Sequence, residues 1–136
     1  MTNDRKEMFY AYIKSNIAPI LVDFINADDL DYATILPANI DKSELNGHYE
    51  GTTFMPPKWF KEIKKILVID KIDTISKEEQ LKFVELLKYK KISTFEIPSD
   101  CIIIVTAKEI NGDKINEEIY SLVAQIWVVK NYEFWY

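Results

Sequence analysis

The chain has 136 residues, of which 48% are hydrophobic, and a formal net charge of −5. This length and composition predict one domain, residues 1–136, with a hydrophobic core of its own. The acidic balance argues against a nucleic-acid-binding protein, and no apolar run approaches the ~20 residues that cross a bilayer. The charged N-terminus has no signal-like apolar core. We therefore expect a soluble, cytoplasmic protein with no nucleic-acid or membrane partner.

The N-terminal part of the chain predicts a helix, a strand and a long loop. Residues 4–17 carry apolar side chains at helical spacing, and the helix should end before Pro19. Residues 19–27, "PILVDFINA", are rich in apolar and β-branched groups and predict a buried strand. Residues 28–57 are punctuated by Asp, Asn, Gly and Pro, which predicts a loop. A loop of that length usually serves a function or an interaction surface.

The remainder of the chain alternates between strand and helix patterns. "KKILVID" is hydrophobic over a whole strand length, as in strands that are covered on both faces of a parallel sheet. Ser76 and Glu79 form a capping box at the start of the next helix. The predicted elements are a strand at 64–70, a helix at 76–91, a short strand or hairpin at 92–98, a strand at 101–107, a helix at 114–125 and a strand from 126. This order predicts an α/β fold, a small three-layer sandwich whose mostly parallel four-stranded sheet is flanked by helices.

Several of these pieces together resemble the AAA+ ATPases of the MoxR-like branch, over residues 19–136. "ILVIDKID" is similar to the family's strand that ends in two acids, which hold Mg²⁺ and polarise the attacking water. "MPPKWFKEIKK" resembles the segment that often precedes that strand, and "CIIIVTAKE" resembles the strand that ends at a polar sensor residue. "EIYSLVAQIWVV" is similar to a helix that ends in an arginine before the last strand. "PILVDFINADDLDYATILP" resembles the family's second strand and the loop after it.

The phosphate-binding loop of that family has no counterpart in this sequence. Such a loop needs several glycines, so that backbone N–H groups can wrap the phosphates, and a lysine followed by a hydroxyl residue. Gly47, Gly51 and Gly112 stand in no such pattern. The resemblance then implies that the chain begins just after the missing loop, lacks the central first strand, and has a first helix equivalent to the one after that loop. The other four strands would form a sheet in the order 19–27, 64–70, 101–107 and 126 onward, with no place for a nucleotide.

Three further positions depart from the family pattern. Asp70 remains at the magnesium-binding position (Walker B), but Lys71 stands where the second acid would be, and it cannot act as a base there. Glu109 falls at the position of the polar sensor, and Gln125 at that of the arginine finger. An arginine finger contributes roughly 10³ to 10⁵ in rate. The resemblance therefore implies a degenerate core with no catalytic residue, no bound metal and no cofactor.

A metal-dependent nuclease or phosphatase is the enzymatic alternative, because carboxylates at strand ends could gather around Mg²⁺ beside a lysine. Its candidate residues are Asp23, Asp70, Asp73, Glu96, Glu109, Lys71 and Lys108. A residual nucleotide binder without hydrolysis is a third reading. Cys101 lies in an apolar run and is expected to be packed, whereas His48 is expected on a surface loop. One cysteine and one histidine cannot make the usual zinc site.

The aromatic end of the chain is a candidate interface. Its residues are Tyr132, Phe134, Trp135 and Tyr136. Aromatic side chains at a terminus either fold back on the core or contact a partner, and the sequence leaves both open. We expect a non-catalytic protein-binding or regulatory module derived from an AAA+ core. Its partner would be a protein, either an intact AAA+ ATPase or a second copy of this chain, contacted through residues 28–57 and 76–91.

Overall fold

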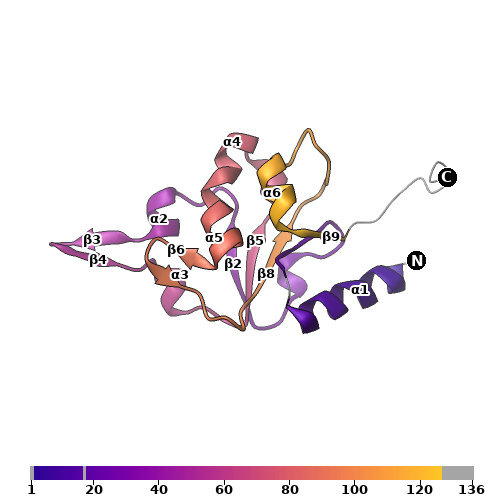
Figure 1. Cartoon of the computed structure of the whole chain (residues 1–136), viewed down its shortest axis with the longest axis horizontal. Helices are drawn as coiled ribbons and strands as arrows, with labels where there is room; N and C mark the ends of the chain where they lie inside the picture. Colours follow the sequence, from indigo (N-terminus) through magenta and orange to yellow (C-terminus); the bar gives the residue numbers. More distant parts are fainter. Residues whose placement is uncertain (1, 17, 127–136) are drawn as a thin grey trace.

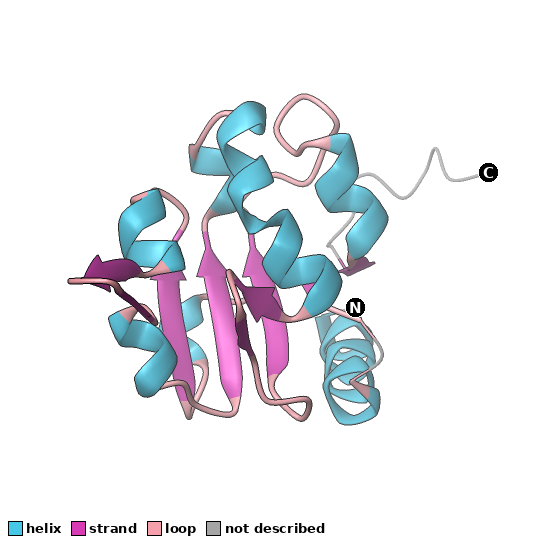
Figure 2. Ribbon diagram, turned by 60° about the vertical axis from the view of Figure 1, so that its left-hand side comes forward, coloured by secondary structure: helices cyan, strands magenta, loops and turns pink. Residues whose placement is uncertain are grey.

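A five-stranded parallel sheet lies at the centre of the molecule (Figures 1 and 2). The computed structural model describes residues 2–16 and 18–126, and the side chains from residue 7 onward. The strand order is β2-β5-β8-β1-β9, and every pair of neighbours is parallel. The strands are β1 (Ile20–Val22), β2 (Ala33–Pro37), β5 (Ile66–Asp70), β8 (Ile102–Thr106) and β9 (Ala124–Ile126). The predicted α/β class with a mostly parallel sheet flanked by helices is confirmed.

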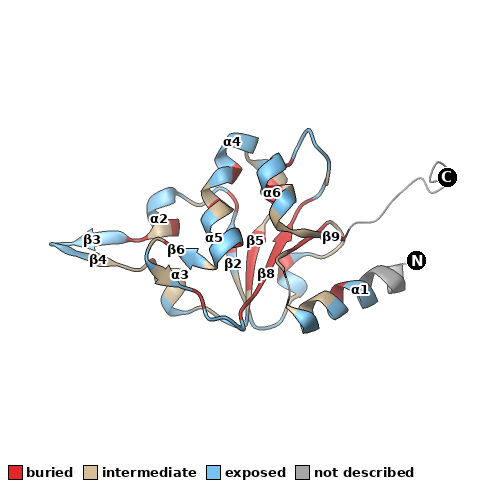
Figure 3. Cartoon of the chain, viewed as in Figure 1, coloured by how far each residue is buried: buried red, intermediate tan, exposed pale blue. Residues whose placement is uncertain are grey.

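Two of the three inner strands, β5 and β8, are apolar up to their last residue because both faces of the sheet are covered. Their side chains alternate between two hydrophobic clusters: Leu67 and Ile69 belong to one, and Val68 belongs to the other. All five residues of β8 are buried (Figure 3). These continuous apolar runs are therefore typical of inner strands of a parallel sheet, as the sequence indicates.

Helices cover the two faces unequally. The face that contains Leu67 is covered by α2 (Lys42–Asn46), α3 (Lys58–Lys61), α5 (Val84–Tyr89) and α6 (Glu117–Leu122), and α4 (Lys77–Gln80) leads into α5. The opposite face receives α1 (Thr2–Ser15), whose Phe9 side chain is completely buried in the second cluster. Helix α1 ends before Pro19, as predicted. Among the described residues, no helix is both long and apolar enough to cross a membrane.

The helix predicted at 76–91 is confirmed as a nearly continuous helical segment. The Ser76 hydroxyl accepts a hydrogen bond from the Glu79 N–H at 3.1 Å, which caps α4. A 3₁₀ turn, η3 (Leu81–Phe83), joins α4 to α5. Lys90 ends α5 in the left-handed conformation, with φ 53°.

Two short hairpins extend the layer beside α2 and α3. The first is formed by β3 (His48–Glu50) and β4 (Thr53–Met55) and protrudes from the body of the molecule (Figure 1). The second is formed by β6 (Lys91–Ile92) and β7 (Phe95–Glu96). The ring of Phe95 stacks on Phe54 at 5.8 Å and lies 5.6 Å from that of Phe60. These aromatic contacts join the two hairpins to α3.

The expected strand number and strand order are wrong. The structure has five strands instead of four, because Ala33–Pro37 forms β2 within the segment 28–57 that was expected to be a loop. The first strand covers Ile20–Val22 only, and it lies between β8 and β9 instead of beside β5. Strand β1 is therefore an inner strand of the sheet, and the expectation that the first strand inside the sheet is absent is wrong. The physical reason is that a crossover connection can pass several strands, so chain order does not fix spatial order.

Candidate functional site

The acidic end of β5 meets the end of β8 at the carboxyl edge of the sheet. The Thr106 hydroxyl donates a hydrogen bond of 2.7 Å to Asp70 Oδ1, and it accepts one of 2.9 Å from the Lys71 N–H. Thr106 is only 4% exposed, so these bonds lie in a largely water-excluded place. The Asp70 carboxylate thus joins the ends of two strands.

Lys71 follows Asp70 in a left-handed backbone conformation, and it supplies no carboxylate at this edge. Its φ of 60° and ψ of 53° are left-handed, a conformation that costs a non-glycine residue about 1–2 kcal/mol. The Lys71 carbonyl accepts hydrogen bonds from the Thr74 hydroxyl at 2.6 Å and the Thr74 N–H at 3.0 Å, within the 3₁₀ turn η2 (Ile72–Thr74). The lysine side chain is exposed. Lys71 therefore turns the chain out of β5.

Asp73 fixes the loop that follows β8. Its Oδ2 accepts hydrogen bonds from the backbone N–H groups of Lys108 (3.1 Å) and Glu109 (3.0 Å). The other oxygen, Oδ1, is buried and has no partner among the described residues. The structure thus brings the sensor-like Glu109 to the same edge as Asp70 and Lys71, with an exposed carboxylate.

The crevice between β1 and β8 is where ligands usually bind in such a sheet, because the connections after these two strands run to opposite edges. Here the Ala107 N–H donates to the Val22 carbonyl at 3.0 Å, which continues the strand pairing beyond β8. Residues 23–32 follow β1, at the place where a phosphate-binding loop would follow the central strand. They contain the 3₁₀ turn η1 (Ala27–Asp29) and have neither glycine nor lysine. Their acidic residues are Asp23, Asp28, Asp29 and Asp31.

Two other predicted residues lie elsewhere. Gln125 is the middle residue of β9, paired with Leu21, and three strand spacings separate it from β5, about 14 Å. Glu96 belongs to the small β6–β7 sheet, and residues 97–101 lead from it to the start of β8, at the opposite edge. In the described part of the chain, no group of three or more His, Cys, Asp or Glu side chains could hold a metal ion. The tail residues Tyr132, Phe134, Trp135 and Tyr136 lie outside the described residues.

The cysteine and the histidine lie as expected. Cys101 is 2% exposed, and burial raises the pKa of its thiol, so it is a packed side chain. His48 is exposed on β3, with Nε2 3.4 Å from Glu50 Oε1.

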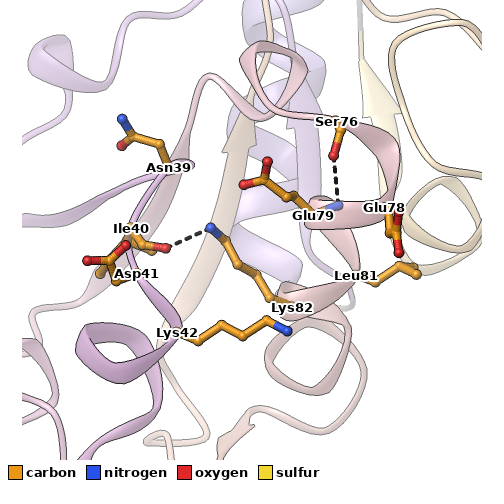
Figure 4. Close-up of a pocket in the computed structure, with 9 residues that line it drawn as sticks. All are labelled: Asn39, Ile40, Asp41, Lys42, Ser76, Glu78, Glu79, Leu81 and Lys82. Atoms are coloured by element: carbon orange, nitrogen blue, oxygen red, sulfur yellow. Dashed lines mark hydrogen bonds between the residues drawn. The ribbon is translucent and has the colours of Figure 1, made fainter.

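A pocket of about 730 Å³ lies beside the ends of β2 and β5 (Figure 4). Lys82 crosses it and donates a hydrogen bond of 2.7 Å to the Ile40 carbonyl. Burial lowers the pKa of Lys82, and Glu79 and Asp41 act against that shift. The lining carries charges of both signs, so it offers no cationic cradle for a phosphate chain.

Gln80 is a structural residue that sequence reasoning missed. It is completely buried, and its Nε2 donates to the carbonyls of Ile72 (3.1 Å) and Lys114 (2.7 Å). Its Oε1 accepts from the Asn116 N–H at 2.8 Å. Gln80 therefore joins the turn after β5 to the loop that precedes α6. The signal in the sequence is a polar residue that continues the apolar helix face of Phe83 and Leu87.

Comparison with solved structures identifies the fold. A protein from Cytophaga hutchinsonii described as a "putative ATPase" matches with a TM-score of 0.60 and 11% identity, over 92% of this chain and 46% of that one. NtrX from Brucella abortus matches with a TM-score of 0.59 and 16% identity, over 93% of this chain and 35% of that one.

The chain has an AAA+-like fold. It spans less than half the length of either of these structures. No protein-family model matches the sequence, and no curated protein does. At such low identity the likeness concerns the fold alone.

Proposed function

We propose that this chain is a non-catalytic protein-binding or regulatory module on an AAA+-like core, which does not bind or hydrolyse ATP. The observation that carries the proposal is the connection after β1, which has no glycine or lysine to hold phosphates, at the same edge as an Asp70 that is followed by Lys71.

The chemistry of nucleotide binding supports this proposal. A triphosphate is bound by clustered backbone N–H groups and a lysine, and its Mg²⁺ needs free carboxylate or hydroxyl oxygens. In this chain, Asp23 directly follows β1 and Glu109 follows β8 at the same carboxyl edge, so both add negative charge there. Binding of a triphosphate there would be opposed by these like charges.

Two other groups that the family uses for hydrolysis, the second acid and the arginine finger, are replaced in this chain. The residue after Asp70 is a lysine in the left-handed conformation, so a cation stands where the second acid of the family pattern would be. Gln125 lies three strands away in β9, and it is a neutral amide that cannot replace a guanidinium. The nuclease or phosphatase alternative has less support, because no three metal-ligating side chains gather among the described residues and Glu96 lies toward the other edge.

The exposed surface supports a binding role. Tyr49 on the protruding β3–β4 hairpin is 70% exposed, and Ile35 on the edge strand β2 is 39% exposed. Both belong to the segment 28–57, which we propose as the surface for a protein partner, either an intact AAA+ ATPase or a second copy of this chain. Exposed aromatic and aliphatic side chains of this kind are common anchors of protein interfaces.

Calorimetry with ATP and with ADP, each with Mg²⁺, tests the proposal. We expect a dissociation constant above about 1 mM, which corresponds to less than about 4 kcal/mol of binding free energy. Micromolar binding of either nucleotide would refute it. The variant Asp70→Ala serves as the control: a genuine Mg²⁺–nucleotide site would lose affinity in it, whereas non-specific heat would not change.

A further inference from the structure

Strand β2 leaves one edge of the sheet open. It is the last strand in the order, with β5 on one side only. The Tyr32 carbonyl accepts from Ile66 and the Ala38 N–H donates to Asp70, so the even-numbered residues of this strand face β5. In a parallel ladder, the backbone groups of Ala33 and Ile35 then point outward. Such an edge can accept a further strand.

An apolar groove of about 510 Å³ runs along this edge. Its apolar lining includes Ile35, Pro37, Ile40, Pro57 and Trp59. The indole of Trp59 is fixed in place by a hydrogen bond of 3.1 Å from Nε1 to the Leu45 carbonyl. Glu44 and Lys58 add one charge of each sign to the lining. An extended apolar segment with few charges would match this groove.

The C-terminal segment of the same chain has that character. Tyr132, Phe134 and Tyr136 occur at every second position, the period of side chains on one face of a strand. Lys130 and Glu133 supply one charge of each sign, as the groove does. Aromatic side chains at alternate positions are suited to pockets beside a sheet edge.

The segment is too short to fill the groove of its own chain. The last described residue, Ile126, ends β9, and four strand spacings separate β9 from β2, about 19 Å. A strand added outside β2 would lie one spacing further, about 24 Å from β9, whereas the six Cα–Cα steps from Ile126 to Tyr132 reach about 20–22 Å when fully extended. Residues 127–131 would also have to pass around the covered faces of the sheet. The geometry therefore favours a groove on another copy.

We propose that residues 130–136 of one copy add to the outer edge of β2 in a second copy and place their aromatic side chains in its groove. This inference rests on the proposed function, because it names the partner of the binding module as this chain itself. The contact joins two different surfaces, so reciprocal exchange between two copies is its smallest closed form.

Sedimentation equilibrium of the full chain and two variants tests the contact. The full chain should show about twice the monomer mass of 16.0 kDa. Deletion of residues 131–136, or the substitution Ile35→Lys, should weaken association at least tenfold and restore the monomer mass. Met8→Lys is the matched control, since Met8 is 43% exposed against 39% for Ile35 and lies on α1, outside the groove. This control should associate like the full chain.

Mixing the two defective chains gives the sharpest outcome. The deletion variant keeps its groove and the Ile35→Lys variant keeps its tail, so an equimolar mixture should form a one-to-one complex although neither associates alone. A full chain that is monomeric at 100-fold above the working concentration would overturn the proposal. Unchanged association of the deletion variant, loss of its far-ultraviolet circular dichroism, or the absence of a mixed complex would each overturn it too. The proposed function would survive all of these results if the full chain binds no nucleotide in calorimetry.

Discussion

Gln80 offers a direct test of what holds the carboxyl edge of the sheet together. The substitution Gln80→Leu keeps nearly the same volume but removes the side-chain amide. It breaks the hydrogen bonds to the carbonyls of Ile72 and Lys114 and to the Asn116 N–H. At about 1 kcal/mol of net stability for each of these bonds, the free energy of unfolding should fall by about 3 kcal/mol.

Urea unfolding monitored by tryptophan fluorescence measures this loss. With an m-value of about 1.5 kcal/mol/M, the unfolding midpoint should decrease by about 2 M. Gln125→Leu makes the same chemical change at an exposed position on β9, and it should alter stability by no more than about 0.5 kcal/mol. If Gln80→Leu were also within about 0.5 kcal/mol of the unmodified chain, the assigned role of Gln80 would be refuted.

Three further predictions concern particular residues. Gly47→Ala should lower the free energy of unfolding by about 2 kcal/mol or more, because φ is +106° and the new Cβ would collide with the Met55 carbonyl oxygen. Gly112→Ala is the control, since the space around Gly112 is open and the change should be nearly neutral. Thermal unfolding measures both variants. Thr106→Val removes the hydrogen bond to the carboxylate at the end of β5 and should lower the urea midpoint by the equivalent of about 1–3 kcal/mol, whereas an unchanged midpoint would show that this bond contributes nothing. Burial raises the pKa of the Cys101 thiol and shields the sulfur from reagents. Alkylation by iodoacetamide at neutral pH should therefore be at least about 100-fold slower in the folded chain than in urea. Equal rates would contradict the packed position of Cys101.

The sequence predicted the elements whose signals are local. Strands β5 and β8 were predicted because a buried parallel strand is apolar at every position, and the start of α4 was predicted because Ser76 caps it. Strand β2 was missed because its five residues lie in a polar segment and end in Pro37, which only an edge strand tolerates well. The inner position of β1 could not be predicted, since the strand order depends on which strands a connection passes over.

For the candidate site, the sequence predicted which residues meet at the sheet edge but not the hydrogen bonds between them. Asp70, Lys71 and Glu109 come together because the carboxyl ends of neighbouring parallel strands lie at one edge. The partner of Asp70, Thr106, ends a strand that is separated from it by a whole helix in the chain, so their hydrogen bond emerges only from the register between β5 and β8. Gln125 was assigned to a helix end, whereas it lies within β9, where its backbone completes the sheet.

Titration of the isotope-labelled chain with Mg²⁺–ATP, followed by amide resonances, tests the central claim most directly. The informative amides are those of Asp70, Thr106 and Ala107, which lie at the edge where an AAA+ core would hold its nucleotide. The account predicts no saturable change of these resonances up to about 1 mM nucleotide, because the connection after β1 is acidic and has neither glycine nor lysine. A saturable shift of these three amides with a micromolar dissociation constant would contradict it.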